Sequence, residues 1–225
     1  MHRNEKGLTA VITINEVLRR SGDALDGLMQ RQADLVRYAF TIEHVHQVNV
    51  SDDPTFQRTF NAVYGVRRNE EWRRHFYQIF EQKKSNPAPQ FGEVVGEIFN
   101  RTGRVEASFA SKLIATLDPN QAVYDSVVLS NFGFRPLTST GVEKIADVVR
   151  DYAAIQSHLD ALVGTDLFAG LRQRFDRQFP QFETFTDLKV LDLLIWQMRD
   201  LGALGYPVPK ARDIGTKTRD NTDAP

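Results

Sequence analysis

The chain has 225 residues, of which 41% are hydrophobic, 10% aromatic and 25% charged. These proportions are typical of a globular protein and exclude a fibrous, collagen-like or wholly disordered chain. The absence of cysteine excludes disulfides, iron–sulfur clusters, thiolate nucleophiles and the common structural zinc sites. The formal net charge of -1 argues against nucleic-acid binding by the whole surface, although it allows a local basic stripe.

Length and local composition predict how the chain is organised. We expect residues 1–202 to form one helical domain, with two lobes meeting near residues 85–89, where the sequence Ser-Asn-Pro-Ala-Pro is typical of a linker. Residues 203–225 are polar and are expected to form a flexible tail. No apolar run approaches the roughly 18 residues of a membrane helix, so no membrane partner is expected. The first ten residues lack the pattern of a secretory signal, which predicts a cytoplasmic location.

Apolar residues recur at spacings of three and four along nearly every long segment, which predicts an all-α fold of about eight to ten helices. Asn69 is a typical N-cap and Gly65 a typical residue just past a helix end. The last helix is apolar almost all round and should therefore lie at the centre of the fold. The predicted helices cover residues 14–20, 23–40, 53–65, 69–83, 91–101, 105–117, 125–129, 142–164, 166–179 and 186–201.

Lys112 is the first candidate for chemistry. On a helical projection it lies at the edge of a broad apolar face, beside the small residues Ser108, Ser111 and Ala115. Loss of hydration at such a border lowers the pKa of a lysine and makes its neutral, nucleophilic amine more available. The alternative is that the stem of Lys112 lies along the apolar edge while its ammonium group stays in water.

Asp125 is the second candidate. It stands just before a helical run, where its carboxylate can accept a bond from the amide of Val127 or Val128 and so cap the helix. As a functional residue, it would be a carboxylate held by a helix terminus and facing the lysine across a turn.

The segment at residues 91–129 resembles the catalytic part of the helix-hairpin-helix DNA glycosylases, especially the 8-oxoguanine glycosylase-like branch. The shared order is a helix, a short turn with Gly103, a helix with an inward Lys112, a second turn, and Asp125 opening the next helix. The resemblance implies that residues 102–105 form a hairpin whose amides hold a DNA phosphate. It also implies that Lys112 is the Schiff-base nucleophile and that Asp125 assists proton transfer and stabilises the cationic sugar.

The densest basic run, residues 67–75, is interleaved with Trp72 and is typical of a surface that binds a nucleic-acid backbone. The alternative is a solvated helix face, because Glu70 and Arg74 have the spacing of a favourable ion pair. In either case Trp72 shares its face with Phe76 and Phe80 and should lie in the core. Phe132 or Phe134 would fill the stack after base extrusion, or would simply anchor a loop. The predicted DNA-binding residues are Arg67, Arg68, Arg73, Arg74, Arg101, Gly103 and Arg104.

Other functional patterns are weak or missing. His44 and His46 point to different sides of a helix, and no third metal ligand is evident, so no metal site is predicted. The sequence contains no phosphate-binding GxxxxGK loop, no GxGxxG and no HExxH, so no cofactor is predicted. The sequence thus favours a glycosylase-like DNA-repair protein acting on duplex DNA. The alternatives are a non-catalytic helical interaction module and nucleic-acid binding without chemistry.

Overall fold

The computed structural model describes residues 11–86 and 88–198, and in these residues the fold is all-α, as the spacing of apolar residues predicted. Ten α-helices and one short 3-10 helix are present, and the described residues contain no strand. The helices are α1 (Ile14–Met29), α2 (Gln32–His44), α3 (Pro54–Tyr64), α4 (Glu70–Lys83), α5 (Phe91–Thr102), α6 (Ala107–Leu117), α7 (Ser126–Asn131), α8 (Gly141–Val163), α9 (Asp166–Gln178), η1 (Pro180–Phe182) and α10 (Asp187–Gln197).

Most helix ends follow the local signals in the sequence. The side chain of Asn69 accepts a bond from the amide of Trp72 and caps α4, while Asp53 caps α3 in the same way. Gly65 adopts a left-handed conformation with φ 63° and ends α3. The expected N-cap at Asn69 and the expected helix end at Gly65 are therefore confirmed.

The break expected between residues 20 and 23 is wrong. Helix α1 continues through Ser21 and Gly22, and the chain instead breaks at Gln30 and Arg31. The Ser21 hydroxyl donates to the Leu18 carbonyl within the helix and accepts a bond from Arg174 of α9. Tertiary packing thus stabilises a Ser-Gly pair that would otherwise weaken the helix.

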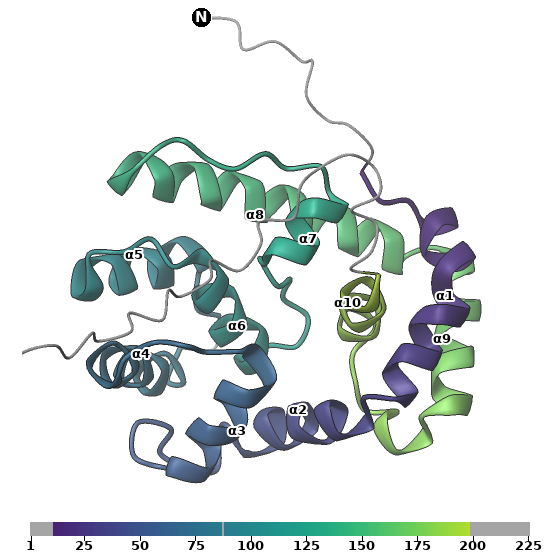
Figure 1. Ribbon diagram of the computed structural model, residues 1–225, viewed down its shortest axis with the longest axis horizontal. Helices are drawn as coiled ribbons and strands as arrows, with labels where there is room; N and C mark the ends of the chain where they lie inside the picture. The colour runs from purple at the N-terminus through teal and green to yellow at the C-terminus, as the bar shows by residue number, and fades with distance from the viewer. Residues whose placement is uncertain (1–10, 87, 199–225) are drawn as a thin grey trace, which may run out of the picture.

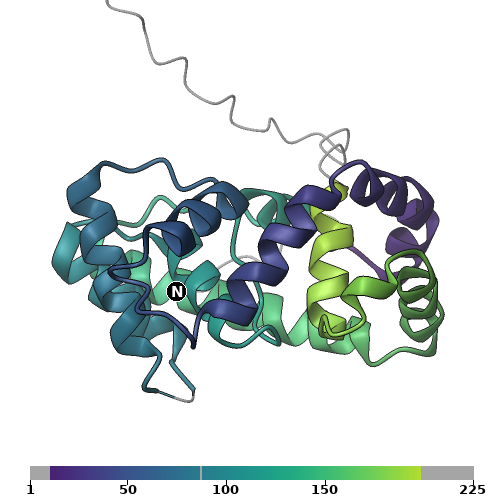
Figure 2. The same ribbon diagram turned by 90° about the horizontal axis from the view of Figure 1, so that it is seen from below.

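Two groups of helices lie side by side, joined by two long connecting elements (Figures 1 and 2). The mid-chain group contains α3, α4, α5 and α6, and the terminal group contains α1, α9 and α10. Helix α2 runs along one side and contacts α1, α3 and α6, while α8 runs along the other and contacts α5, α9 and α10. Of the residues expected to separate two lobes, 85, 86, 88 and 89 are described and lie between α4 and α5, which pack against each other.

The last helix, which was expected at the centre of the fold, belongs to the terminal group and is packed on several sides by other helices. Helix α10 contacts α1, α7, α8 and α9, and Val190, Leu191, Leu194 and Ile195 are fully buried. Trp72 also lies in the core, stacked on Phe76. None of the described helices combines the length and the apolar character needed to span a membrane. The expected polar tail at residues 203–225 lies outside the described residues.

Candidate functional site

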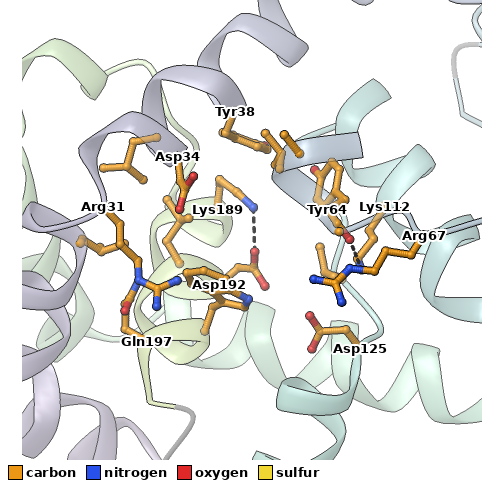
Figure 3. Close-up of a pocket in the computed structure, with 18 residues that line it drawn as sticks. Arg31, Asp34, Tyr38, Tyr64, Arg67, Lys112, Asp125, Lys189, Asp192 and Gln197 are labelled. Carbon is orange, nitrogen blue, oxygen red and sulfur yellow. Dashed lines mark hydrogen bonds and ion pairs between the residues drawn. The ribbon is translucent and has the colours of Figure 1, made fainter. Parts of the chain in front are cut away.

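A central pocket of about 420 Å³ lies where the two groups of helices meet. Its walls come from α1, α2, α3, α6 and α10, from the turn after α3, and from the loop that leads into α7. Figure 3 shows Lys112, Tyr64 and Arg67 on one side and the α10 residues on the other. The polar lining residues are Arg31, Asp34, Tyr38, Tyr64, Arg67, Lys112, Asp125, Lys189, Asp192 and Gln197.

Lys112 reaches the pocket from the middle of α6. Its Nζ donates to the Tyr64 carbonyl at 3.2 Å and lies 5.8 Å from the centre of the Tyr64 ring and 5.6 Å from that of Phe109. This carbonyl is at the end of α3, where the left-handed Gly65 stops the helix and leaves carbonyls without intrahelical partners. The amine is thus held against aromatic rings and a helix C-terminus inside the pocket.

Asp125 lines the same pocket and is the N-cap of α7. One carboxylate oxygen, Oδ1, accepts bonds from the amides of Val127 at 2.9 Å and Val128 at 3.0 Å. The expected capping role is confirmed, and it fixes the orientation of the carboxyl group. Because only Oδ1 is occupied by these bonds, Oδ2 is left to interact with a ligand.

Burial shifts both groups toward their neutral forms. Desolvation lowers the pKa of Lys112, even though the nearby charges of Asp125 and Asp192 act in the opposite direction. Desolvation also raises the pKa of Asp125, against the effect of the Val128 amide and of Lys112. The pocket therefore combines a more nucleophilic amine with a more basic carboxylate.

Two charged residues of the pocket, Lys189 and Asp192 of α10, were not among the predicted site residues. They form a buried ion pair of 2.8 Å, with Lys189 5% and Asp192 7% exposed. Burial alone would lower the pKa of Lys189, but Asp192 and the tyrosines Tyr38 and Tyr64 raise it above its ordinary value. A signal for this pair was present in the sequence: two opposite charges stand three positions apart in a helix that was expected to be central.

A second cavity, the arginine groove, brings together four of the predicted DNA-binding residues. Arg67, Arg68, Arg101 and Arg104 line this cavity of about 370 Å³ together with His75. Arg67 also lines the central pocket, so the two cavities are adjacent. Predicted contacts that do not line the groove are Arg73, Arg74 and Gly103.

The basic run is not paired as its spacing suggested. Glu70 and Arg74 form no ion pair, although both lie in the described part of the chain; Arg68 instead makes two bonds of 3.0 Å to Glu106. Arg101 pairs with Glu97 within α5. Arg67 and Arg104 have no acidic partner in the described residues, so their charges are available to an anion.

The turn between α5 and α6 uses part of its own hydrogen-bonding capacity. Gly103 has φ 69°, and its amide donates to the Phe99 carbonyl at 2.7 Å. The Arg104 amide lies 3.3 Å from the Thr102 hydroxyl oxygen and donates to it. Two of the amides expected to hold a phosphate are thus engaged within the turn, which leaves the arginine side chains as the stronger candidates.

The two phenylalanines expected to fill the base stack are anchored in the fold. Phe132 is 3% exposed and packs edge-on against His158, and Phe134 stacks on Phe132. Insertion of Phe132 into DNA would require it to leave the core, so the loop-anchor alternative fits its position better. Among the described residues, no group of three or more His, Asp or Glu side chains is placed to hold a metal ion.

Comparison of the chain with protein-family models, with curated proteins and with solved structures finds no match, so the geometry of the central pocket carries the functional argument.

Proposed function

We propose that the protein is a glycosylase-like DNA-repair enzyme that takes an extruded nucleotide into the central pocket and excises its base. One observation supports this most strongly: Lys112 and Asp125, from separate helices, line the same pocket and are both shifted toward neutrality by burial. Displacement of a base from its sugar by an amine needs at least two groups around one cavity, a nucleophile and a carboxylate.

The chemistry follows from these two groups. The Lys112 amine attacks C1′ of the deoxyribose, a C–N bond forms, and the glycosidic bond breaks with its electron pair leaving on the base. The departing base takes up the proton that the attached amine releases. The C1′–O4′ bond of the sugar then breaks, O4′ takes up a proton from solvent, and a protonated Schiff base remains between C1′ and Lys112. Asp125, held by the amides of Val127 and Val128, stabilises the positive charge that develops on the sugar.

The size and surroundings of the pocket suit this substrate. A volume of about 420 Å³ falls in the range of small-molecule sites, and enzymes that act on a base inside a duplex must first extrude it into such a cavity. The arginine groove next to it offers Arg67 and Arg104 to the DNA backbone. Arg67, which lines both cavities, would contact the phosphate nearest the extruded nucleotide.

Borohydride trapping tests the proposal directly. The protein is incubated with a duplex bearing an abasic site or 8-oxoguanine, and reduction makes any Schiff base permanent. We expect a covalent adduct that disappears in Lys112→Ala and persists in Lys144→Ala, a lysine control on α8 outside the central pocket.

An adduct that survives Lys112→Ala would overturn the assignment of the nucleophile. No adduct and no base release on either substrate would overturn the lysine chemistry. The same result would favour a non-catalytic interaction module over an enzyme.

A further inference from the structure

The end of the central pocket formed by α2 and α10 contains polar groups that the proposed chemistry does not use. Tyr38 is only 2% exposed, and its buried hydroxyl has no hydrogen-bond partner among the described residues. Its ring is held edge-on by Phe185, with centroids 5.2 Å apart. Leaving a buried hydroxyl unpaired is unfavourable and rare in native proteins, so a ligand that pairs with it would explain why it lies in the pocket wall.

Gln197 has the same property. Its side-chain Nε2 is buried without a partner in the described part of the chain, and the residue lines the same pocket. Its Oε1 lies against Gly27 of α1, where an added Cβ would be only 2.8 Å away. The absence of a side chain at Gly27 therefore makes room for this position of the amide.

Four charged side chains lie at this end: Asp34, which pairs with Arg37, Arg31, whose guanidinium lies 5.1 Å from the centre of the Trp196 ring, and the pair Lys189 and Asp192. Lys189 and Asp192 are paired at 2.8 Å, and Lys189 lies 4.1 Å above the Tyr38 ring. Burial raises the pKa of Tyr38, so its hydroxyl stays protonated and remains a hydrogen-bond donor at neutral pH. Two donors beside a neutralised ion pair suit an uncharged ligand that presents hydrogen-bond acceptors.

We infer that Tyr38 and Gln197 determine specificity by binding the edge of an uncharged nucleobase that carries carbonyl oxygens. The Tyr38 hydroxyl donates to one acceptor of the base, and the Gln197 amide donates to another. This inference rests on the proposed function, because it assigns the base to one end of the pocket and the sugar to the end with Lys112 and Asp125.

The test compares duplexes that differ only at the extruded position. Affinity is measured by fluorescence anisotropy for duplexes bearing 8-oxoguanine, hypoxanthine or uracil, and for one bearing a tetrahydrofuran abasic analogue. The ratio of each affinity to that of the abasic analogue isolates the contribution of the base. The variants are Tyr38→Phe and Gln197→Leu, and the matched control is Tyr77→Phe, whose hydroxyl bonds to Asn61 at 2.8 Å and to the Gln57 carbonyl at 3.1 Å.

We expect at least one base-bearing duplex to bind more tightly than the abasic analogue. Tyr38→Phe should reduce that ratio about tenfold, which is the effect of losing one buried hydrogen bond to a ligand. Affinity for the abasic analogue and trapping at an abasic site should be unchanged, as should all ratios in Tyr77→Phe. Tyr38→Phe should not lower the stability of the free protein, because the hydroxyl it removes has no hydrogen-bond partner among the described residues.

Two results would overturn the inference: no base in the panel binds better than the abasic analogue, or both variants leave the ratios unchanged. Equal weakening of base-bearing and abasic duplexes would do the same, because it would indicate a structural role. The two proposals fail separately. If the wild-type protein traps no adduct, the Lys112 chemistry fails while the ratios still decide the role of Tyr38 and Gln197.

Discussion

The opposite charges of Lys112 and Asp125 attract each other, which favours the charged form of both groups. Burial nevertheless lowers the pKa of Lys112 and raises the pKa of Asp125, so both shifts favour the neutral form. Desolvation thus outweighs their attraction, and the absence of an ion pair between them keeps the amine free to react. This arrangement costs folding free energy at neutral pH, as residues selected for chemistry often do. Two predictions at the scale of single residues follow from it.

The first concerns the pH dependence of trapping. Only the neutral amine attacks, so the initial rate of adduct formation should rise with pH through the pKa of Lys112. The charge of Asp125 raises that pKa, so Asp125→Asn should move the midpoint to lower pH while reducing the maximum rate. Rates measured over a pH series in both proteins check this, and a midpoint that moves upward would contradict it.

The second concerns stability. The folded-state pKa of Asp125 is raised, so the fold favours its protonated form and loses stability as the group ionises with rising pH. Asp125→Asn keeps the cap without the charge and should raise the free energy of unfolding at neutral pH. The gain should vanish below the unfolded pKa of about 3.9, where wild-type Asp125 is protonated in both states.

Urea titrations of the wild-type protein and Asp125→Asn, at neutral pH and below the unfolded pKa, measure the difference in their free energies of unfolding. Asp125→Ala, which also removes the cap, should unfold more easily than Asp125→Asn by about 1 kcal/mol. Equal stability of the Asn and Ala variants would show that the bonds to Val127 and Val128 contribute nothing.

At the scale of the elements, α10 combines a fully apolar core face with a buried ion pair. Helices α1, α7, α8 and α9 surround it, so the Lys189 and Asp192 side chains remain close to the pocket and away from bulk water. The turn between α5 and α6 illustrates a different constraint, because it requires a left-handed residue at position 103. Each element supports one stability prediction.

For α10, removing one charge of the ion pair should lower the free energy of unfolding more than removing both charges. Lys189→Met leaves Asp192 buried and unpaired and should destabilise the protein by about 3 kcal/mol or more. The double variant Lys189→Met with Asp192→Leu should recover most of that loss, because two apolar side chains need no hydration. A urea double-mutant cycle measures the coupling, and additive effects of the two changes would argue against it.

For the α5–α6 turn, the effect of alanine should depend on backbone conformation. A Cβ at Gly103 or at Gly96 would meet nothing within 4 Å, so space does not distinguish the two sites. Gly103→Ala should cost about 1 kcal/mol because φ is 69°, whereas Gly96→Ala, inside α5, should stabilise by about 0.5 kcal/mol. Thermal unfolding of both variants provides the comparison, and equal shifts would exclude a conformational origin.

At the scale of the whole molecule, the site exists because the mid-chain and terminal groups of helices meet around it. Lys112 comes from the first group and Lys189 and Asp192 from the second, while α2 closes one side (Figures 1 and 3). The arginine groove opens next to this junction on the mid-chain group. A protein with a net charge of -1 thus gathers four arginines in one groove that Glu71 also lines, and two of them, Arg67 and Arg104, have no acidic partner in the described residues.

The arginine groove makes the proposed DNA binding sensitive to salt. Affinity for duplex DNA should fall steeply as the salt concentration rises, and Arg67→Ala or Arg104→Ala should each reduce the slope of log affinity against log salt by about 1. The matched control is Arg177→Ala, an exposed arginine on α9 outside both cavities. A slope unchanged by the groove variants, or reduced equally by Arg177→Ala, would contradict this role.

The sequence by itself determined the all-α fold, the caps at Asn69 and Asp125, and the burial of α10, because periodicity and capping are local properties. It also singled out Lys112 and Asp125. Only the tertiary structure decided that they share a pocket, that Arg68 pairs with Glu106, and that α1 continues through Ser21. These outcomes depend on contacts between segments distant in the chain, which no local pattern records. The Tyr38 hydroxyl is the clearest case, since its burial and its lack of a partner within residues 11–86 and 88–198 are properties of the assembled helices.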